Sequence, residues 1–300
     1  MRLVTVLHHG ERRAGVLTDG EVLVTSLPGG LDGAIAQGLG PAELASRAHR
    51  SVAPEEAVLD APLRPPVVFC TGQNYADHLS EKAPVVVDEP EFFLKAGQTI
   101  AAPGEPCVRD ETMTKKLDYE TELGVVIGRA GRNIPPERAL DHVYGYVVVN
   151  DLSARDRQVV ILGEGRYGSA LGPGKNFDGA TRLAPWVTSA GDLPGAESLS
   201  LTTRVNGELR QSTTTGSMLF PVPALIAFVS SLLTLPPASV IATGTPGGTG
   251  WGRDAELGGT GRTPPGCAPA RYLVPGDTVV SEIERVGVLE FEVTPGSSTS

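Results

Sequence analysis

The sequence has 300 residues, of which 40% are hydrophobic, and a formal net charge of −10. An acidic chain without a basic cluster argues against nucleic acid and anionic membranes as partners. No run of ~18 apolar residues occurs, and the first residues lack the apolar segment and cleavage site of a signal peptide. The three cysteines are widely spaced and suit a reducing compartment, so we expect a cytoplasmic protein.

The first part of the chain is predicted to form a small α/β unit. Residues 1–10 and 11–25 have the pattern of short strands joined by Gly turns, and residues 40–50 that of a helix. A Pro-rich stretch at 51–66 then marks a boundary. The expected parts are an N-terminal α/β domain at 1–62, a second domain at 63–294 and a disordered tail at 295–300.

The larger part is expected to be mainly β, because 37 Gly and 25 Pro accompany short apolar runs. Strands are predicted at 67–72, 90–100, 117–128, 144–151, within 184–216 on either side of an Asn206–Gly207 turn, at 239–243 and at 273–293. Helices are predicted at 74–82, within 128–143, at 153–165 and at 221–235. Ser153 and Asp156 have the spacing of a capping box at the start of the third helix. The predicted class is therefore α+β, mainly β.

Three acids alternate along the strand predicted at 117–128, namely Asp118, Glu120 and Glu122. Alternate side chains of a strand share a face, about 7 Å apart, where two charges repel by about 2.4 kcal/mol at an effective dielectric of ~20. Salt bridges on an exposed strand are one explanation. Binding of a hard divalent cation is the other, and Asp151, at the end of an apolar strand, is a further candidate ligand unless it caps a helix.

Two further pairs of residues are candidates for binding or catalysis, and each has the spacing that places two side chains on one face of a helix. Arg155 and Gln158 are three residues apart and suit a carboxylate-bearing ligand, although solvent exposure is the alternative for Gln158. His78 and Glu81 are also three apart, and a carboxylate on an imidazole makes a general base that can activate water. Surface pairing explains most isolated His–Glu pairs of this kind.

Taken together, these segments resemble the fumarylacetoacetate hydrolase family, specifically its acylpyruvase-like members. The matching motifs occur in order over residues 65–293: GQNYADH, FFLK, LDYETELGVVIG, NDLSARDRQ, GKNF, IATGTPGG and PGDTVVSEIERVG. The resemblance implies a mixed β-roll with flanking helices, a homodimer and a divalent metal, with Mg²⁺ favoured over Mn²⁺ or Ca²⁺. The residues it implies are Glu120, Glu122 and Asp151 for the metal, His78, Glu81 and Lys175 for catalysis, and Arg155, Gln158 and Thr245 for the substrate carboxylate.

Two features fall outside this assignment. Lys95 of FFLK matches the family but receives no role, and Asp118 is expected to support the site without binding the metal. Residues 250–273, which include Trp251 and Arg253, form a longer segment than in compact relatives. This segment is expected either to shape the distal end of the pocket or to be a surface loop.

The resemblance implies hydrolysis of a C–C bond in a 2,4-dioxo acid through a metal-stabilised enolate. Lys175 would stabilise the developing carbanion, and the His78–Glu81 pair would activate water. The alternative within the family is a decarboxylase, isomerase or tautomerase of a related 2-oxo diacid. A catalytically idle metal-binding protein is a third possibility, but it does not account for the presence of His78, Glu81 and Lys175.

Overall fold

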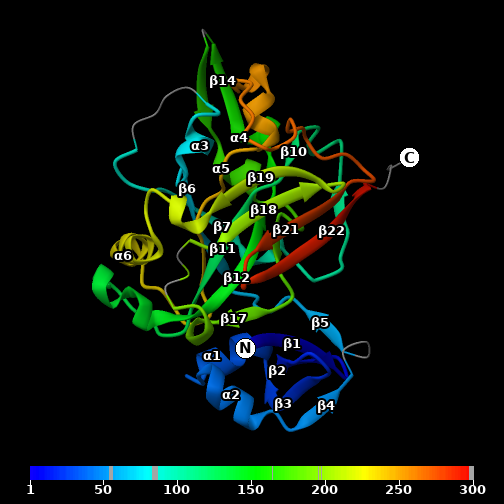
Figure 1. Ribbon diagram of the computed structural model, residues 1–300, viewed down its shortest axis with the longest axis vertical. Helices are drawn as coiled ribbons and strands as arrows, with labels where there is room; N and C mark the ends of the chain where they lie inside the picture. Colours follow the sequence, from blue (N-terminus) through cyan, green and yellow to red (C-terminus); the bar gives the residue numbers. More distant parts are fainter. Residues whose placement is uncertain (54–56, 83–86, 164, 195, 197, 297–300) are drawn as a thin grey trace.

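A computed structural model describes residues 1–53, 57–82, 87–163, 165–194, 196 and 198–296 (Figure 1). Its elements combine one large mixed sheet with smaller sheets and short helices, which confirms the predicted α+β, mainly β class. Within the described ranges, no helix is both long and apolar enough to span a bilayer.

The N-terminal unit lies at one end of the molecule (Figure 1, blue). Its elements are β1 (Arg2–His8), β2 (Glu11–Leu17), β3 (Val22–Pro28), α1 (Gly30–Ala36), α2 (Pro41–Arg47), β4 (Arg50–Val52) and β5 (Val58–Asp60). The predicted strands and the α2 helix are confirmed, whereas α1 was not predicted. Strand β1 pairs with β2 and β5 and also with β17 (Val187–Ser189), so the unit continues the main sheet. Whether residues 1–62 form a separate domain stays a prediction.

The elements between β5 and β17 supply most of the remaining strands of the main sheet and two small two-stranded sheets, β10-β13 and β14-β15. They are β6 (Val67–Gly72), α3 (Ala76–Leu79), β7 (Glu91–Ala96), β8 (Ile100–Ala101), β9 (Cys107–Arg109), β10 (Leu117–Asp118), β11 (Thr121–Ile127), β12 (Val143–Asp151), β13 (Ser153–Ala154), α4 (Arg155–Gln158), β14 (Val159–Gly163), β15 (Arg166–Ser169), α5 (Leu171–Lys175) and β16 (Thr181–Leu183). With β20 (Val240–Ala242) from further along the chain, the main path of the sheet runs β4-β3-β2-β1-β17-β12-β11-β20-β6-β7.

The C-terminal part adds a second sheet in the order β19-β18-β21-β22-β9. The elements of this part of the chain are β18 (Ser200–Val205), β19 (Glu208–Thr214), α6 (Val222–Leu232), β20 (Val240–Ala242), β21 (Thr278–Ile283) and β22 (Gly287–Pro295), of which β20 belongs to the main sheet. Asn206 and Gly207 join β18 to β19 with φ of 53° and 79°, the left-handed pair that a tight hairpin needs. Pro295 ends β22, and residues 297–300 of the predicted tail lie outside the described residues.

Short 3-10 helices complete the chain at Gly97–Thr99, Pro136–His142, Ala190–Asp192, Thr215–Ser217, Gly250–Arg253 and Ala255–Leu257. The helix predicted within 128–143 is therefore a 3-10 segment that packs against α6. Its two prolines fit the start of such a segment, since Pro135 precedes it in extended conformation and Pro136 opens it.

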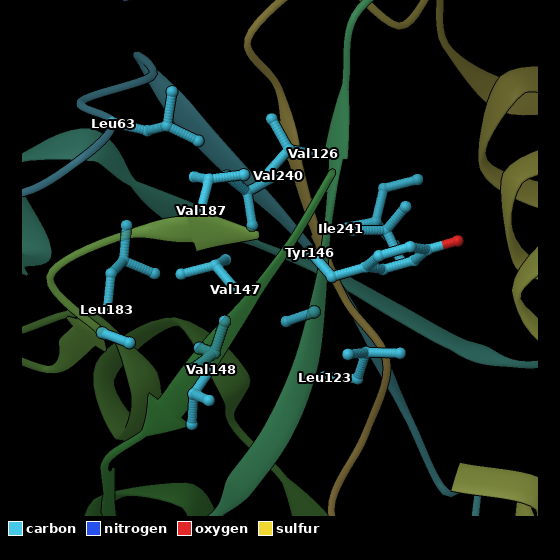
Figure 2. Close-up of a cluster of buried hydrophobic side chains, with 14 of the residues drawn as sticks. Leu63, Leu123, Val126, Tyr146, Val147, Val148, Leu183, Val187, Val240 and Ile241 are labelled. Atoms are coloured by element: carbon cyan, nitrogen blue, oxygen red, sulfur yellow. The ribbon is translucent and has the colours of Figure 1, made fainter. Parts of the chain in front are cut away.

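The core lies where β11, β12 and β20 pair (Figure 2). All seven residues of β11 are buried, and Leu123 and Val126 lie in the same apolar cluster as Val147, Val240 and Ile241. A strand buried on both faces needs a nearly continuous apolar run, which explains the sequence LGVVI. This rigid centre carries the ends of β11 and β12 on which the site is built.

The helix predicted at 153–165 is wrong beyond its first turn. Only Arg155–Gln158 is helical, and Val159–Gly163 forms β14, because consecutive β-branched residues favour a strand. The predicted capping box is also wrong, since Ala154 is the N-cap and no side chain caps the turn. Ser153 instead donates to the Asp151 carbonyl at 3.1 Å, and Asp156 accepts from the amide of Lys115 at 2.9 Å.

Candidate functional site

The predicted strand at 117–128 is broken in two just where its acids lie. Strand β10 ends at Asp118 and pairs with β13, whereas β11 begins at Thr121 and pairs with β12. Between them, the Glu120 amide donates to Oδ1 of Asn150 at 3.1 Å instead of joining a regular ladder. The three acids therefore do not line one face of one strand, and this break separates Asp118 from the two glutamates.

Glu120, Glu122 and Asp151 nevertheless come together. One carboxylate oxygen of each lies within 4.8 Å of the others, and all three side chains are buried. The β11–β12 pairing explains this, because Thr121 lies opposite Asn150 and the Asp151 amide donates to the Glu120 carbonyl at 2.9 Å. We refer to these three residues as the acid triad.

Buried cations surround the acid triad. Lys175 donates to Asp151 at 2.8 Å and to Glu120, and Lys95 donates to the other Asp151 oxygen and to the Ala180 carbonyl. Both lysines are almost fully buried. The ion pairs with Asp151 and Glu120 outweigh burial and raise the pKa of Lys175 above its ordinary value, so this lysine stays charged. Lys95, which had no expected role, thus belongs to the site.

Glu122 differs from the other two acids of the triad. It forms no ion pair within the described part of the chain, and it accepts a hydrogen bond from the Gly244 amide at 2.8 Å. Burial, followed by the charges of Asp151 and Glu120, raises the pKa of Glu122 well above its ordinary value. A divalent cation would relieve this crowding of like charges.

The donor set fits such a cation. Carboxylate oxygens are what Mg²⁺, Mn²⁺ and Ca²⁺ prefer, and buried acids at this spacing are otherwise costly. The network holds one more acid than base, so with all its acids ionised and a divalent cation bound its net charge would be +1, which favours an anionic ligand. The acids are Asp118, Glu120, Glu122 and Asp151, and the bases are Lys95, Arg155 and Lys175.

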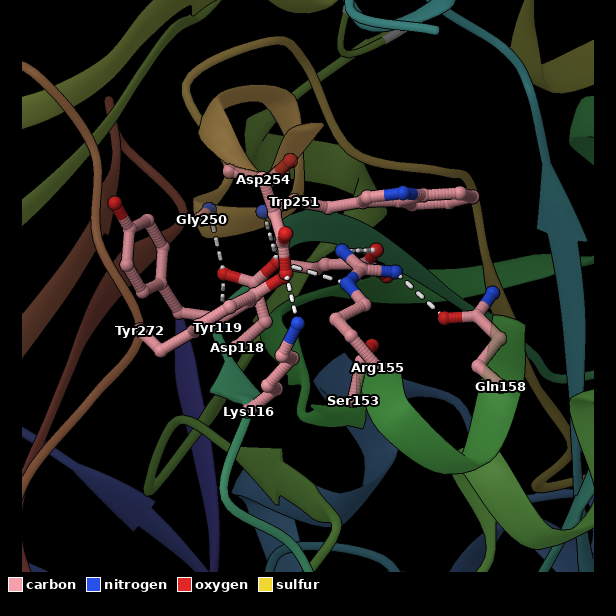
Figure 3. A network of polar contacts seen from close by, with 12 residues as sticks. Lys116, Asp118, Tyr119, Ser153, Arg155, Gln158, Gly250, Trp251, Asp254 and Tyr272 are labelled. Atoms are coloured by element: carbon pink, nitrogen blue, oxygen red, sulfur yellow. Dashed lines mark hydrogen bonds and ion pairs between the residues drawn. The ribbon is translucent and has the colours of Figure 1, made fainter. Parts of the chain in front are cut away.

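Arg155 links the acid triad to the rest of the pocket, and Figure 3 shows its contacts with Asp118 and Gln158. Its guanidinium donates to Asp118 at 2.8 Å, to Glu120 at 2.5 Å and to the Gln158 side-chain oxygen at 2.7 Å. Asp118 also accepts the amides of Gly250 at 2.7 Å and Trp251 at 3.0 Å. Asp118 therefore orients Arg155 and fixes the start of the 250–273 segment, which explains why this acid is buried.

The His78–Glu81 pair lies on and just after α3. Nδ1 of His78 is 2.9 Å from Glu81, which also accepts the Gly248 amide at 2.6 Å and the Thr249 hydroxyl at 3.0 Å. Burial raises the pKa of Glu81 to about 8, against those two hydrogen bonds. Burial, and then Lys82, lowers the pKa of His78 well below its ordinary value, so the imidazole is neutral.

One cavity contains eight of the nine predicted site residues. Its walls include the acid triad together with His78, Arg155, Gln158, Lys175 and Thr245. Glu81 lies behind His78 and does not line the cavity. The hydroxyl of Thr245 is already engaged, since it donates to the Thr121 carbonyl at 3.2 Å and accepts from Gln211 at 2.9 Å.

Sequence reasoning missed Lys82 and left open whether the segment that carries Trp251 reaches the site. Lys82 lines the cavity, and its ammonium lies 4.0 Å from the centre of the Trp251 ring. The same ring lies 4.9 Å from the Arg155 guanidinium carbon and contacts His78 edge-on. The 250–273 segment thus contributes Trp251 beside the site, and no sequence motif indicated Lys82 apart from its place next to Glu81.

Comparisons with known proteins identify the relatives of this chain. Residues 67–294 match the family described as fumarylacetoacetate (FAA) hydrolase C-terminal. The chain is 35% identical over 242 residues to oxaloacetate tautomerase YisK of Bacillus subtilis, covering 79% of this chain and 73% of that protein.

Two solved structures illustrate the shared fold. Fumarylacetoacetate hydrolase of Exiguobacterium antarcticum superposes with a TM-score of 0.79 at 33% identity, covering 99% of this chain and 100% of that one. Maleylpyruvate hydrolase of Sphingobium sp. SYK-6, solved with manganese (II) and pyruvate, superposes with a TM-score of 0.75 at 26% identity and the same coverage. With the family match over most of its length and a relative this similar, the chain belongs to the fumarylacetoacetate hydrolase family.

Proposed function

We propose that this protein interconverts the keto and enol forms of a small 2-oxo acid, with a divalent cation held by the acid triad. The observation that carries the proposal is that the buried triad lines the same cavity as Arg155, Lys175 and a neutral His78. The resemblance to an oxaloacetate tautomerase favours this reaction over the C–C hydrolysis expected from the sequence.

The chemistry follows from the groups that face the cavity. A bound divalent cation would supply Lewis acidity that stabilises negative charge on the 2-oxo oxygen. Arg155 and Gln158 would orient the substrate carboxylate, because a guanidinium and an amide next to each other match its two oxygens. Lys175 adds a fixed positive charge where the enolate forms.

His78 would move the proton at the carbon next to the 2-oxo group. Its Nδ1 faces Glu81, and no described residue hydrogen-bonds to its Nε2. A neutral imidazole that donates Nδ1–H to Glu81 leaves the lone pair of Nε2 free to accept a proton. Returning that proton to the oxygen or the carbon then completes the interconversion.

C–C hydrolysis of a 2,4-dioxo acid is the second candidate, and the same His78–Glu81 pair favours it. A base that takes a proton from carbon also takes one from water. The related maleylpyruvate hydrolase supports this reaction within the fold. The two reactions differ in whether a water molecule attacks a second carbonyl after the enolate has formed.

Parallel assays with Mg²⁺-loaded enzyme separate the candidates. Decay of the enol absorbance of oxaloacetate reports tautomerisation, and loss of acetylpyruvate or fumarylpyruvate reports hydrolysis. We expect enol decay well above the uncatalysed rate, lowered about 100-fold or more by His78→Ala and unchanged by His49→Ala, a histidine on the surface. Hydrolysis without tautomerisation would promote the second candidate, and neither reaction would refute both.

We further propose Mg²⁺ as the cation, a cytoplasmic location and a homodimer. The β14–β15 hairpin supports the dimer, because its strands pair only with each other among the described residues and it projects at the end opposite the N-terminal unit (Figure 1). Ile161 and Leu162 on it are 62% and 56% exposed. Light scattering would test this, with Ile161→Asp expected to give a monomer.

A further inference from the structure

Lys82 is a charged residue of the cavity to which the proposed reaction gives no task. It follows α3 by three residues and lines the same cavity as the acid triad. We propose that Lys82, held against Trp251, binds a second carboxylate of the substrate, so that the pocket selects 2-oxo dicarboxylic acids over 2-oxo monocarboxylic acids. This inference rests on the proposed binding of a 2-oxo acid at the triad.

The pairing of the cavity cations separates Lys82 from the others. Arg155 forms ion pairs with Asp118 and Glu120, and Lys175 forms them with Glu120 and Asp151. Each of these two cations therefore already has protein carboxylates that balance its charge. No ion pair of the described residues includes Lys82, so its charge is available to a ligand.

The surroundings of Lys82 favour the binding of an anion next to its ammonium group. Burial, followed by the nearby charge of Arg155, lowers the pKa of Lys82 to about 8. The ammonium is thus still largely protonated at neutral pH. Its side chain is only partly exposed, and it forms no ion pair with a described residue, although the charges of Glu120, Glu91 and Glu81 act on it. A carboxylate entering the cavity would restore the solvation lost on burial with a charge-assisted hydrogen bond.

Trp251 holds the ammonium in place. The Lys82 nitrogen lies 4.0 Å from the ring centre, within the range of a favourable cation–π contact. The ring itself is fixed, because its Nε1 donates to the Leu257 carbonyl at 2.9 Å and its backbone amide donates to Asp118 at 3.0 Å. Figure 3 shows the ring lying across the Arg155 guanidinium. Lys82 is thereby kept near the group proposed to bind the first carboxylate.

A matched pair of substrates tests the inference. Oxaloacetate and its 4-ethyl ester share the 2-oxo acid and differ in the second carboxylate. The measured quantity is the ratio of their kcat/KM values with the Mg²⁺-loaded wild-type enzyme, Lys82→Met, Lys82→Arg and, as a control, Lys115→Met, whose lysine is exposed. Methionine keeps the apolar stem against Trp251 and removes the charge.

We expect the diacid-to-ester ratio to fall about tenfold or more in Lys82→Met, and to stay within about threefold of wild type in Lys82→Arg and Lys115→Met. Calorimetric binding of 3,3-difluoro-oxaloacetate, which cannot enolise, and of its 4-ethyl ester should show the same pattern without turnover. If Lys82→Met lowered kcat/KM and affinity equally for the diacid and the ester, or changed neither, the proposed role of Lys82 would be overturned. A wild-type enzyme that shows the binding pattern but no turnover would instead overturn the proposed reaction.

Discussion

Replacing two acids of the triad should have opposite effects on stability. Asp151 forms ion pairs with Lys95 and Lys175, whereas Glu122 forms none among the described residues. Asp151→Asn leaves the buried Lys95 ammonium without its anion and removes one of the two carboxylates paired with Lys175, a loss of the kind that costs about 3–5 kcal/mol. Glu122→Gln removes a charge whose ligand oxygen lies within 4.8 Å of those of Asp151 and Glu120.

The magnitude for Glu122 follows from that spacing. Two unit charges 4.8 Å apart repel by about 3.5 kcal/mol at an effective dielectric of ~20. Protonation of Glu122 relieves part of this repulsion in the metal-free protein, so the measured gain should be smaller. A glutamine oxygen still accepts the Gly244 amide, which the glutamate accepts at 2.8 Å. Metal-free Glu122→Gln should therefore be at least as stable as the wild type.

The assay is thermal unfolding with and without metal. The wild-type protein should gain about 2.7 kcal/mol at a cation concentration of 100 times Kd, and both variants should lose this gain. Glu290→Gln, an exposed glutamate on β22, controls for the amide substitution and should behave like the wild type. The reasoning is refuted if metal-free Glu122→Gln unfolds at a lower temperature than the metal-free wild type, or if the variant keeps the full stabilisation by metal.

Three further predictions follow from the contacts of the site. Asp118→Asn should raise KM about tenfold and leave the metal Kd nearly unchanged, since it removes one of the two carboxylates that orient Arg155 and leaves the triad intact; a KM equal to that of the wild type would contradict this. The rate of enol decay should rise with pH through about 8, because the pKa of Glu81 is raised to about 8 and its ionised form accepts the hydrogen bond from the His78 imidazole. Glu81→Gln should flatten this rise. If Lys82→Met flattened it instead, the assignment of the rise to Glu81 would be wrong. Lys175→Met should lower kcat about 100-fold, because it removes the positive charge that stabilises the enolate. It should not weaken metal binding, because the lost charge lies beside the triad and repels a cation. An increased Kd for Mn²⁺ in calorimetry would contradict this.

Much of the site was predictable because its signals are local. The Asn206–Gly207 turn, the apolar run of β11 and the ordered motifs each depend on a few neighbouring residues. The triad was implied by the family resemblance, which selected Glu120, Glu122 and Asp151 and set Asp118 aside; the pairing of adjacent strands then brings the three together. The turn and the apolar run are short-range patterns that one sequence displays.

What escaped prediction depends on contacts distant in sequence. The chain breaks at Glu120 because Asn150, 30 residues away, takes its amide, and no local propensity shows this. Lys82 meets Trp251 only because the 250–273 segment folds back over α3, where the Thr260 amide donates to the Glu81 carbonyl at 3.0 Å. The helix predicted after Asp151 failed because helical spacing of Arg155 and Gln158 persists for a single turn.

The central claim is that enolisation of a 2-oxo acid depends on a cation in the acid triad. The most direct measurement is the enol-decay rate of oxaloacetate with the purified enzyme before chelation, after removal of divalent cations with EDTA, and after addition of Mg²⁺ or Mn²⁺. The account predicts that chelation abolishes the catalysed rate, that either cation restores it, and that Glu122→Gln is not restored. A catalysed rate that persists unchanged after chelation would contradict it.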